Sequence, residues 1–387
     1  MNYNVSHPTK IINCEVDLPS SKSISNRLLI IQALCKQNFE ITNLSYSDDT
    51  NSLKKALNTT KNTIDVGPAG TSFRFLTSYL STQKKKAFIL TGTDRMKERP
   101  IQNLVAALQM LGAKISYLEK DNFPPLKIKG TTILGGEITI DASISSQFIS
   151  SLLLIAPTLA NGLILNISGN LVSKSYIQMT LKLMEEFGIK HSWNDNKIVV
   201  NNQNYIGKNY AVESDWSAAT FWFEIASLSD VCNIKLNGLQ QNSIQGDAKA
   251  TTIFKDFGIA SVFKDNTLTL TKNNNQNFPK TINLIDLPDI YQSLKCTLFA
   301  LNKPTELTGI STLKDKETDR VMAVENELKK LRTSKIIETY KDHRMAMSFS
   351  PLSLKYGELT IKNSEVVSKS YPNFWQDLSK AGFIIES

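Results

Sequence analysis

The sequence predicts a two-domain α/β protein whose strands form several small sheets rather than one large sheet. Strand-like and helix-like patterns alternate along nearly all of its 387 residues. The strand patterns are short and polar on one side, unlike the continuous Val/Ile runs of a buried parallel sheet. A helix that ends in hydrophobic-Gly-hydrophobic and leads into a strand recurs at 108–113, 183–189 and 253–259. This repetition indicates a fold assembled from similar strand–helix units.

The expected elements follow from residue periodicity. Strands, with period-two alternation or β-branched residues, are expected at 39–44, 86–92, 126–130, 137–141, 163–169, 197–202, 233–239, 267–272 and 359–364. Helices are expected at 24–36, 71–82, 100–112, 146–160, 175–188, 215–229, 246–258, 289–302, 317–331, 343–355 and 373–382. No low-complexity linker interrupts this series, so the domain junction is expected to be tight.

The composition favours a cytoplasmic protein without a metal centre. No run of 18 apolar residues and no secretory signal is present, which argues against a membrane protein. The four cysteines (Cys14, Cys35, Cys232 and Cys296) are scattered without a CxxC pair and are expected to be reduced. The three histidines are too far apart to suggest a zinc site.

The net charge of +8 is compatible with nucleic acid, an acidic membrane or a small anionic substrate as partner. Many lysines lie in Asn/Lys-rich stretches such as 81–88 and 271–280, where a solvated surface is the simplest interpretation. The total charge therefore decides little, and the positions of the remaining cations carry the information.

Cations recur at expected helix starts, where the helix macrodipole disfavours them. Lys22 and Arg27 open the first expected helix without any acid. Lys, Arg, Ser, Thr, Gln or Gly also stand at the starts in 68–76, 94–104, 143–148, 172–178, 314–322, 341–347 and 368–375. Free N–H groups at helix N-termini bind anions, and hydroxyl and guanidinium groups extend such a site. If these starts converge, they would bind two anionic groups, whereas no nucleotide-binding GxxxxGK[ST] or GxGxxG motif is present.

Acids are interleaved with these cations. Asp286 and Asp289 lie at a strand-to-helix turn, and Glu317 and Asp319 lie in KETDR. A carboxylate beside cations stays ionised and can act as a base, while a second carboxylate or a lysine returns a proton. Helix capping or a first-turn position is the alternative interpretation for each acid.

The motifs LPSSKSISNR, PAGTSFR, DRMKERPI, SISSQF, SKSYI, IDLPD, KETDR, DHRMAM and SKSYPNFW resemble, in order and spacing, those of the 5-enolpyruvylshikimate-3-phosphate synthase family. The resemblance spans nearly the whole chain. It implies transfer of the enolpyruvyl group of phosphoenolpyruvate to the 5-hydroxyl of shikimate 3-phosphate, with release of phosphate. It also implies a monomer that uses no cofactor and binds neither nucleic acid nor a membrane.

The resemblance further implies two domains, residues 14–212 and residues 1–13 plus 213–387. Each would contain three βαβαββ units in an inside-out α/β barrel, with both substrates in the interdomain cleft. The implied catalytic residues are Asp289 as base, with Glu317 and Lys22 as candidate acids. The implied shikimate 3-phosphate contacts are Lys22, Ser23, Arg27, Ser145, Ser146, Gln147, Ser173, Asp289, Thr312 and Lys316. The implied phosphoenolpyruvate contacts are Lys22, Gly70, Arg99, Gln147, Arg320, Arg344 and Lys369.

Three positions depart from the family pattern. Ser20 replaces a Gly, Pro68 replaces an Asn, and Thr312 stands where the family usually has an Asn. Pro68 removes a side-chain amide and a backbone donor, so the phosphoenolpyruvate end is expected to differ locally. None of the three substitutions affects the implied acid, base or arginines.

Three alternatives are weighed against this interpretation. The related transferase acting on UDP-N-acetylglucosamine usually carries a cysteine in its catalytic loop, and no cysteine lies in a matching loop here. A nucleic-acid-binding protein would interleave aromatic residues with a basic stripe. An inactive family member is disfavoured by the retained Lys22, Asp289, Glu317 and arginines.

Overall fold

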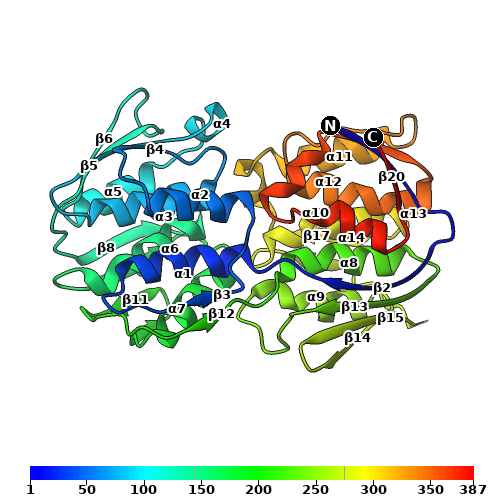
Figure 1. Ribbon diagram of the computed structural model, residues 1–387, viewed down its shortest axis with the longest axis horizontal. Coiled ribbons are helices and arrows are strands. Elements are labelled where there is room, and N and C mark those ends of the chain that lie inside the picture. Colours follow the sequence, from blue (N-terminus) through cyan, green and yellow to red (C-terminus); the bar gives the residue numbers. More distant parts are fainter. Residues whose placement is uncertain (144, 274) are drawn as a thin grey trace. The chain divides into compact units, whose positions relative to one another are not determined.

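The computed structural model describes residues 1–143, 145–273 and 275–387, so Ile144 of the SISSQF motif lies outside the described residues. The chain divides into two compact units (Figure 1). The N-unit is Lys22–Val212, and the C-unit combines Met1–Ser21 with Glu213–Ser387. None of the described helices has the length and apolar character needed to cross a membrane.

One boundary of the two compact units differs from the expected domain boundary. Residues 14–21 were assigned to the first domain, but they belong to the C-unit. The reason is strand pairing, because β2 (Ile11–Asp17) runs parallel to β13 (Val231–Asn237) over its full length. The Ser21 amide also donates to the Glu213 carbonyl at 2.8 Å. The chain therefore leaves the C-unit after Ser21 and returns to it at Glu213.

The described residues of the N-unit form two four-stranded sheets and a two-stranded sheet. The first sheet is β4 (Thr63–Asp65), β5 (Ala87–Thr91), β7 (Leu126–Lys129) and β6 (Lys114–Tyr117). The second is β10 (His191–Asn194), β11 (Lys197–Val200), β9 (Leu163–Ser168) and β8 (Gly136–Asp141). The third pairs β12 (Tyr210–Ala211) with β3 (Ile41–Thr42).

The helices of the N-unit pack mainly on one another. They are α1 (Lys22–Leu34), α2 (Asp48–Leu57), α3 (Gly70–Ser81), α4 (Asp94–Lys97), α5 (Gln102–Met110), α6 (Ser146–Ile155) and α7 (Lys174–Glu186), with the 3-10 turn η1 (Ala156–Thr158). Helix α6 is buried from Phe148 to Ile155, and α1, α3 and α7 pack against it. A helix that is apolar on all sides belongs in the interior, and the strands, with alternating buried and exposed residues, cover it.

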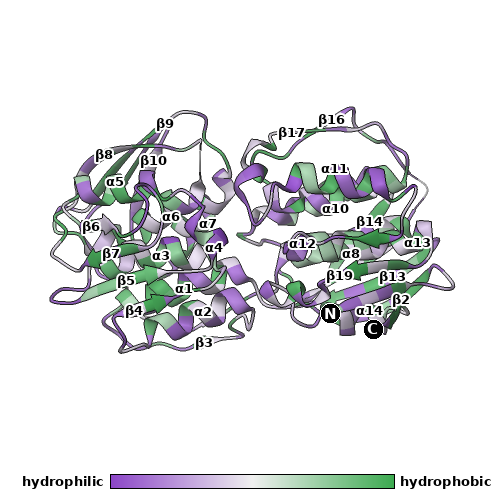
Figure 2. Ribbon diagram, turned by 90° about the horizontal axis from the view of Figure 1, so that it is seen from above, coloured by the Kyte–Doolittle hydropathy of each residue, from purple (hydrophilic) through white to green (hydrophobic). Residues whose placement is uncertain are grey.

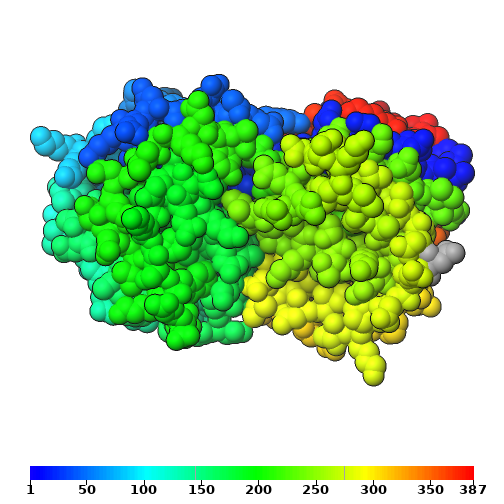
Figure 3. All heavy atoms as spheres, turned by 90° about the horizontal axis from the view of Figure 1, so that it is seen from below, coloured from blue at the N-terminus to red at the C-terminus, as the bar shows by residue number. Residues whose placement is uncertain are grey.

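The C-unit repeats this plan within its described residues. Its sheets are β14 (Ile259–Lys264), β15 (Thr267–Lys272), β13 and β2; β18 (Ile336–Ile337), β19 (Leu359–Lys362), β1 (Asn2–Ser6) and β20 (Ile384–Glu386); and β16 (Thr281–Asn283) with β17 (Glu306–Thr308). Because β1 pairs with β19 and β20, the two chain ends lie side by side on the surface of this unit (Figure 3).

The helices of the C-unit are α8 (Trp216–Leu228), α9 (Ala250–Lys255), α10 (Tyr291–Ala300), α11 (Arg320–Lys330), α12 (His343–Phe349), α13 (Ser353–Tyr356) and α14 (Phe374–Lys380). Its 3-10 turns are η2 (Gly246–Lys249), η3 (Pro288–Ile290), η4 (Ser311–Asp315), η5 (Ser350–Leu352) and η6 (Ser364–Lys369). Helix α8 is hydrophobic over most of its length, whereas α11 alternates in hydropathy (Figure 2). Accordingly α8 is the central buried helix of this unit.

All four four-stranded sheets share one pairing pattern. Each begins with a parallel pair, to which two further strands are added by antiparallel pairing. A parallel pair requires a crossover, commonly a helix, and an antiparallel pair can close through a hairpin. The two-stranded sheets keep only the parallel pair. The predicted α/β fold of two domains is confirmed, with the repeated unit shortened in one sheet of each unit.

Prolines change the bounds of two expected helices. The helix expected at 343–355 ends at Phe349, because Pro351 lies in the 3-10 turn that separates α12 from α13. The helix expected at 289–302 begins as a 3-10 turn at Pro288, and α10 starts at Tyr291. Proline fixes φ and lacks an N–H donor, so it is tolerated at such starts and not within a helix.

Candidate active site

The predicted site residues fall into two groups, one in each unit. Lys22, Ser23, Arg27, Gly70, Arg99, Ser145, Ser146, Gln147 and Ser173 lie in the N-unit and are called the N-unit cluster. Asp289, Thr312, Lys316, Glu317, Arg320, Arg344 and Lys369 lie in the C-unit and are called the C-unit cluster.

Hydrogen bonds gather several helix starts at one end of the N-unit. Lys22, the first residue of α1, forms an ion pair with Asp49 in the first turn of α2 at 3.0 Å. The Ser72 hydroxyl, in the first turn of α3, donates to the Asp49 carbonyl at 2.9 Å. Gln147 in the first turn of α6 donates to the Thr71 hydroxyl at 3.1 Å. The starts of α1, α2, α3 and α6 therefore lie near one another, and converging helix N-termini can bind an anion.

Arg27 is buried and bonded to neutral oxygens. Its guanidinium donates to the Thr180 hydroxyl at 2.7 Å, the Ser23 carbonyl at 2.8 Å and the Tyr176 carbonyl at 3.2 Å. Burial lowers the pKa of Arg27 to about 10. Within the described residues Arg27 has no ion-pair partner. It fixes the carbonyl of Ser23 and joins α1 to the first turns of α7.

Gly70 lies against two arginines. A Cβ atom at Gly70 would lie 2.5 Å from an Arg99 nitrogen and 2.8 Å from an Arg74 nitrogen. Arg74, which is 5% exposed, donates to the Gly70 carbonyl at 2.8 Å. The absence of a side chain at position 70 therefore permits both guanidinium groups to approach the start of α3. Arg74 was not among the predicted site residues, although it lies in the PAGTSFR motif.

The serines of the N-unit cluster stand at helix starts. Ser145 is the N-cap of α6, and its hydroxyl accepts from the Gln147 amide at 3.3 Å. Ser173 is the N-cap of α7, has a positive φ of 56° and is 5% exposed. Ser146 is buried in the first turn of α6. These serines therefore place hydroxyl groups at the N-terminal ends of α6 and α7.

The C-unit cluster is organised around Arg320, the first residue of α11, whose side chain is 2% exposed. Its guanidinium forms ion pairs with Asp342 at 2.8 Å, Glu317 at 2.8 Å and Asp289 at 3.0 Å. Burial alone would lower the pKa of Arg320, but Asp342, Glu317 and Asp289 outweigh it, and the pKa is raised above its ordinary value. Helix α10 begins two residues after Asp289, and α12 begins directly after Asp342. These two helices pack on one another (Figure 1).

Two further cations complete the network. Arg344 forms an ion pair with Asp289 at 3.2 Å and donates to the Asp289 carbonyl at 2.8 Å. Lys369, which is 8% exposed, pairs with Glu317 at 2.8 Å. Among the described residues, three cations thus meet three carboxylates, and the two proposed proton-transfer acids are both held by cations.

The other acids and polar residues take simpler places. Asp319 is the N-cap of α11 and accepts from the Met322 amide at 3.1 Å, which is the capping role held open for it. Thr312 lies in the 3-10 turn η4, and Lys316 follows that turn directly. His343 is buried beside Asp342, with its Nδ1 3.6 Å from the carboxylate.

Sequence reasoning missed three acids. Asp342 is fully buried, anchors Arg320, and accepts from the Arg344 amide at 2.9 Å; its signal was the first letter of the DHR motif. Asp49 is the partner of Lys22. Asp247 is 4% exposed and accepts from the Ser217 hydroxyl at 2.5 Å. Burial and the charge of Asp289 raise the pKa of Asp247 to about 7.

The described residues contain no group of three or more His, Cys, Asp and Glu side chains able to hold a metal ion. The chemistry that the two clusters offer is electrostatic and acid–base. Basic groups and helix N-termini can neutralise phosphates and carboxylates, and Asp289 and Glu317 can exchange protons.

The fold and the residues of both clusters define a class, a two-domain α/β transferase for small anionic substrates. The chain belongs to the EPSP synthase (3-phosphoshikimate 1-carboxyvinyltransferase) family, whose sequence model matches residues 6–65 and 51–378.

Relatives of known name support this membership. The chain is 44% identical over 408 residues to the 3-phosphoshikimate 1-carboxyvinyltransferase of Bacteroides fragilis strain YCH46, covering 100% of this chain and 99% of that protein. It is 38% identical over 418 residues to the enzyme of the same name from Buchnera aphidicola subsp. Cinara cedri, covering 96% and 95%. A solved structure of EPSP synthase from Acinetobacter baumannii matches with a TM-score of 0.78 at 21% identity and covers all of both chains, which shows the shared fold.

Proposed function

We infer that this chain transfers the enolpyruvyl group of phosphoenolpyruvate to the 5-hydroxyl of shikimate 3-phosphate, giving 5-enolpyruvylshikimate 3-phosphate and phosphate. Membership of the family over nearly the whole chain supports the activity. The observation that carries the assignment of roles is the C-unit network, in which the cations Arg320, Arg344 and Lys369 are paired with Asp289, Glu317 and Asp342.

Phosphoenolpyruvate is a small polyanion, and its proposed contacts are mainly cations. We propose that its phosphate and carboxylate bind to Lys22, Gly70, Arg99, Gln147, Arg320, Arg344 and Lys369. Arg344 and Lys369 now pair with Asp289 and Glu317. When a substrate anion takes over part of these contacts, the two carboxylates become better proton acceptors, because opposite charges nearby are what keep a carboxyl ionised.

The proposed contacts of shikimate 3-phosphate are helix starts and hydroxyls. We propose Lys22, Ser23, Arg27, Ser145, Ser146, Gln147, Ser173, Asp289, Thr312 and Lys316. The helix dipoles and serine hydroxyls at the starts of α6 and α7 suit a phosphate. The Arg27 side chain bonds to Ser23 and α7, so its proposed contribution includes holding the start of α1 in shape.

Proton transfer is proposed to run through Asp289 and Glu317. Asp289 takes the proton of the 5-hydroxyl as that oxygen bonds to C2 of phosphoenolpyruvate, and C3 receives a proton from Glu317, with Lys22 as the rival donor. In the second step C3 loses a proton, the C2=C3 double bond forms again and the C2–O bond to phosphate breaks. No oxidation state changes overall, so the proposal includes no cofactor.

We further propose that the protein acts as a monomer in the cytoplasm. Four free thiols, Cys14, Cys35, Cys232 and Cys296, support a reducing compartment.

The direct test of the activity is phosphate release with shikimate 3-phosphate and phosphoenolpyruvate, followed by identification of the enolpyruvyl product by mass spectrometry. UDP-N-acetylglucosamine as acceptor is the control and should release no phosphate. Release with that acceptor, and none with shikimate 3-phosphate, would overturn the assignment.

A further inference from the structure

A hollow of about 360 Å³ opens on the C-unit at the C-terminal end of α10. Its walls come from α10, the loop that follows it, Arg332 after α11, and Tyr356 at the end of α13. None of the C-unit cluster residues lines it. The hollow is therefore separate from the residues assigned to catalysis.

Three cations line this hollow. Lys295 and Lys303 are half-buried, and Arg332 is exposed. Among the described residues none of the three forms an ion pair, and no acidic side chain lines the hollow. This contrasts with the C-unit cluster, where every cation of the network meets a carboxylate.

Aromatic rings form an apolar wall beside these cations. The rings of Phe299 and Tyr356 lie 6.0 Å apart at 32°. The Lys303 ammonium lies 4.6 Å from the ring of Phe278, and Lys335 lies 5.4 Å from the ring of Tyr356. Burial raises the pKa of Tyr356, and the positive charge of Arg332, which also lines the hollow, acts in the opposite direction.

Helix dipoles account for only part of this charge. Helices α10 and α11 end at Ala300 and Lys330, near these cations, and a helix C-terminus carries about half a negative charge. Two such ends supply roughly one negative charge against three positive ones. About two positive charges remain without a counter-charge.

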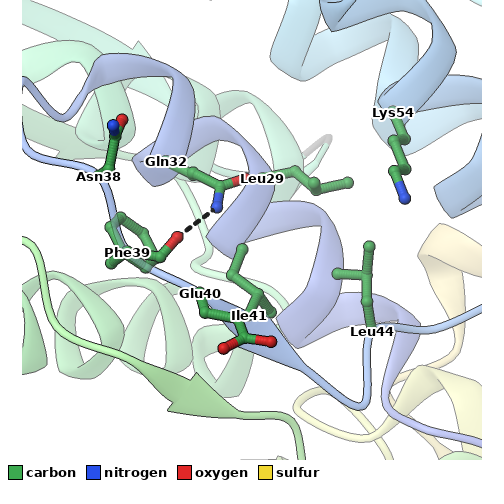
Figure 4. Close-up of a pocket in the computed structure, with 8 residues that line it drawn as sticks. All are labelled: Leu29, Gln32, Asn38, Phe39, Glu40, Ile41, Leu44 and Lys54. Atoms are coloured by element: carbon green, nitrogen blue, oxygen red, sulfur yellow. Dashed lines mark hydrogen bonds between the residues drawn. The ribbon is translucent and has the colours of Figure 1, made fainter.

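A second hollow, in the N-unit, has a lining whose charges balance (Figure 4). It is lined by one lysine, Lys54, and one acid, Glu40, with four apolar side chains and two neutral amides around them. Gln32 is turned towards the Phe39 carbonyl and donates to it at 2.9 Å. That hollow has no surplus of charge and gives no reason to expect an anion.

We propose that the hollow formed by Lys295, Phe299, Lys303, Arg332 and Tyr356 binds a small organic anion. The ligand would carry a doubly negative group, such as a phosphate monoester, and an apolar ring. The anionic group would contact the lysines and the guanidinium, which suits bidentate binding of a phosphate. The ring would lie against Phe299 and Tyr356.

The test uses phenyl phosphate as the probe and isothermal titration of the full-length protein. We expect phenyl phosphate to bind with a Kd of about 10 mM or lower. The double variant Lys295→Ala/Arg332→Ala should lose about tenfold or more in affinity, because two charge-assisted contacts disappear. Lys264→Ala, an exposed lysine on β14 outside the hollow, is the matched control and should bind as the parent does.

The outcomes separate this site from the catalytic clusters. Phenyl phosphate that binds at Arg344 or Lys369 would still bind to the double variant. We therefore expect the double variant to bind one equivalent of phenyl phosphate fewer than the parent and to keep the parental turnover. Equal binding by parent and double variant would overturn the proposal, and so would no binding up to about 10 mM. If the double variant has a lower melting temperature but an unchanged affinity for phenyl phosphate, the cations only stabilise the helix C-termini, and the proposal is overturned.

Inorganic phosphate is the second probe. If the aromatic wall contributes, inorganic phosphate should bind several-fold more weakly than phenyl phosphate, and the variant Tyr356→Ala should remove that difference. Equal affinity for both probes would overturn the ring-binding part of the proposal.

Discussion

Arg27 of the N-unit cluster and Arg320 of the C-unit cluster are both buried, but they are stabilised in different ways. In the N-unit, Arg27 is buried among hydroxyl and carbonyl oxygens and keeps no carboxylate partner within the described residues. In the C-unit, Arg320 touches three carboxylates. The first arrangement supplies charge and hydrogen-bond donors, and the second also supplies groups that can take up and return protons. We therefore expect the N-unit residues mainly to hold substrate anions and the C-unit acids Asp289 and Glu317 to carry the proton transfer.

The largest effect is expected for Asp289→Ala. Removal of the proposed base should lower turnover by about 10²- to 10⁴-fold, while shikimate 3-phosphate still binds. Turnover at saturating substrates and a separate titration with shikimate 3-phosphate measure the two properties. The control is Asp286→Ala, three residues earlier in the same turn. Near-normal turnover of Asp289→Ala would show that Asp289 is not the base and would contradict the assignment of proton transfer to the C-unit cluster.

Arg99→Ala and Arg344→Ala test whether both clusters contact the same substrate. Each removes a charge-assisted contact of roughly 1.5–3 kcal/mol, so the KM for phosphoenolpyruvate should rise about 10- to 150-fold. Binding of shikimate 3-phosphate should change far less. The control is Arg95→Ala, whose side chain forms an exposed ion pair with Glu98 in the same segment as Arg99. Equal losses for both substrates would contradict the assignment.

Glu317→Gln separates proton donation from binding. The amide keeps the shape of the side chain and can still accept from Arg320, but it cannot donate a proton from a carboxyl group. We expect slower exchange of solvent deuterium into the methylene of phosphoenolpyruvate, by about 10²-fold, with a smaller change in KM. An unchanged exchange rate would assign the donor role to Lys22, whose ammonium now pairs with Asp49.

The charged contacts of the two clusters could be predicted only in part from the sequence. Cations at helix starts follow from local pattern, so Lys22, Arg320 and Arg344 could be singled out by position. Their partners could not be singled out, because Asp49 and Asp342 match the pattern of ordinary first-turn or capping acids. Only the fold shows that Asp49 pairs with Lys22 and Asp342 with Arg320. Asp247 gives no local signal at all, because its raised pKa results from burial and from the charge of Asp289, which only the fold brings near it.

The fold shows the same division between local and long-range information. Alternating strands and glycine-terminated helices predicted the repeated α/β units. The strand Ile11–Asp17 was not predicted, and its seven-residue pairing with β13 is what moved the domain boundary to Ser21. Pairing between segments more than 200 residues apart leaves no trace in local periodicity. By contrast, the break of the helix after Phe349 could have been predicted from Pro351.

The smallest effect on activity is expected for changes at two buried glutamates of the C-unit. They test whether a buried carboxyl group stays ionised only when it has hydrogen-bonding or charged partners. Glu224 on α8 is fully buried, and both its carboxyl oxygens lack a hydrogen-bond partner among the described residues. Burial raises the pKa of Glu224 well above its usual value near 4.5. Glu327 on α11 is also buried but accepts from the Tyr340 hydroxyl at 2.8 Å, Lys330 at 3.1 Å and the Glu338 amide at 3.1 Å.

The two variants Glu224→Gln and Glu327→Gln should therefore change stability in opposite directions. Above pH 4.5 the unfolded chain ionises Glu224 while the folded chain keeps its proton, so the parent loses stability as pH rises towards the folded pKa. Glutamine carries no such proton, so the advantage of Glu224→Gln should be small near pH 4 and grow as pH rises. Glu327→Gln should cost about 1–3 kcal/mol at neutral pH, because charged and polar donors lose their ionised acceptor. Urea unfolding from pH 4 to pH 8 measures both, with turnover near the parental value as the expected result for Glu224→Gln. A loss of stability for Glu224→Gln that grows with pH would mean that the carboxylate is ionised and paired in the folded protein.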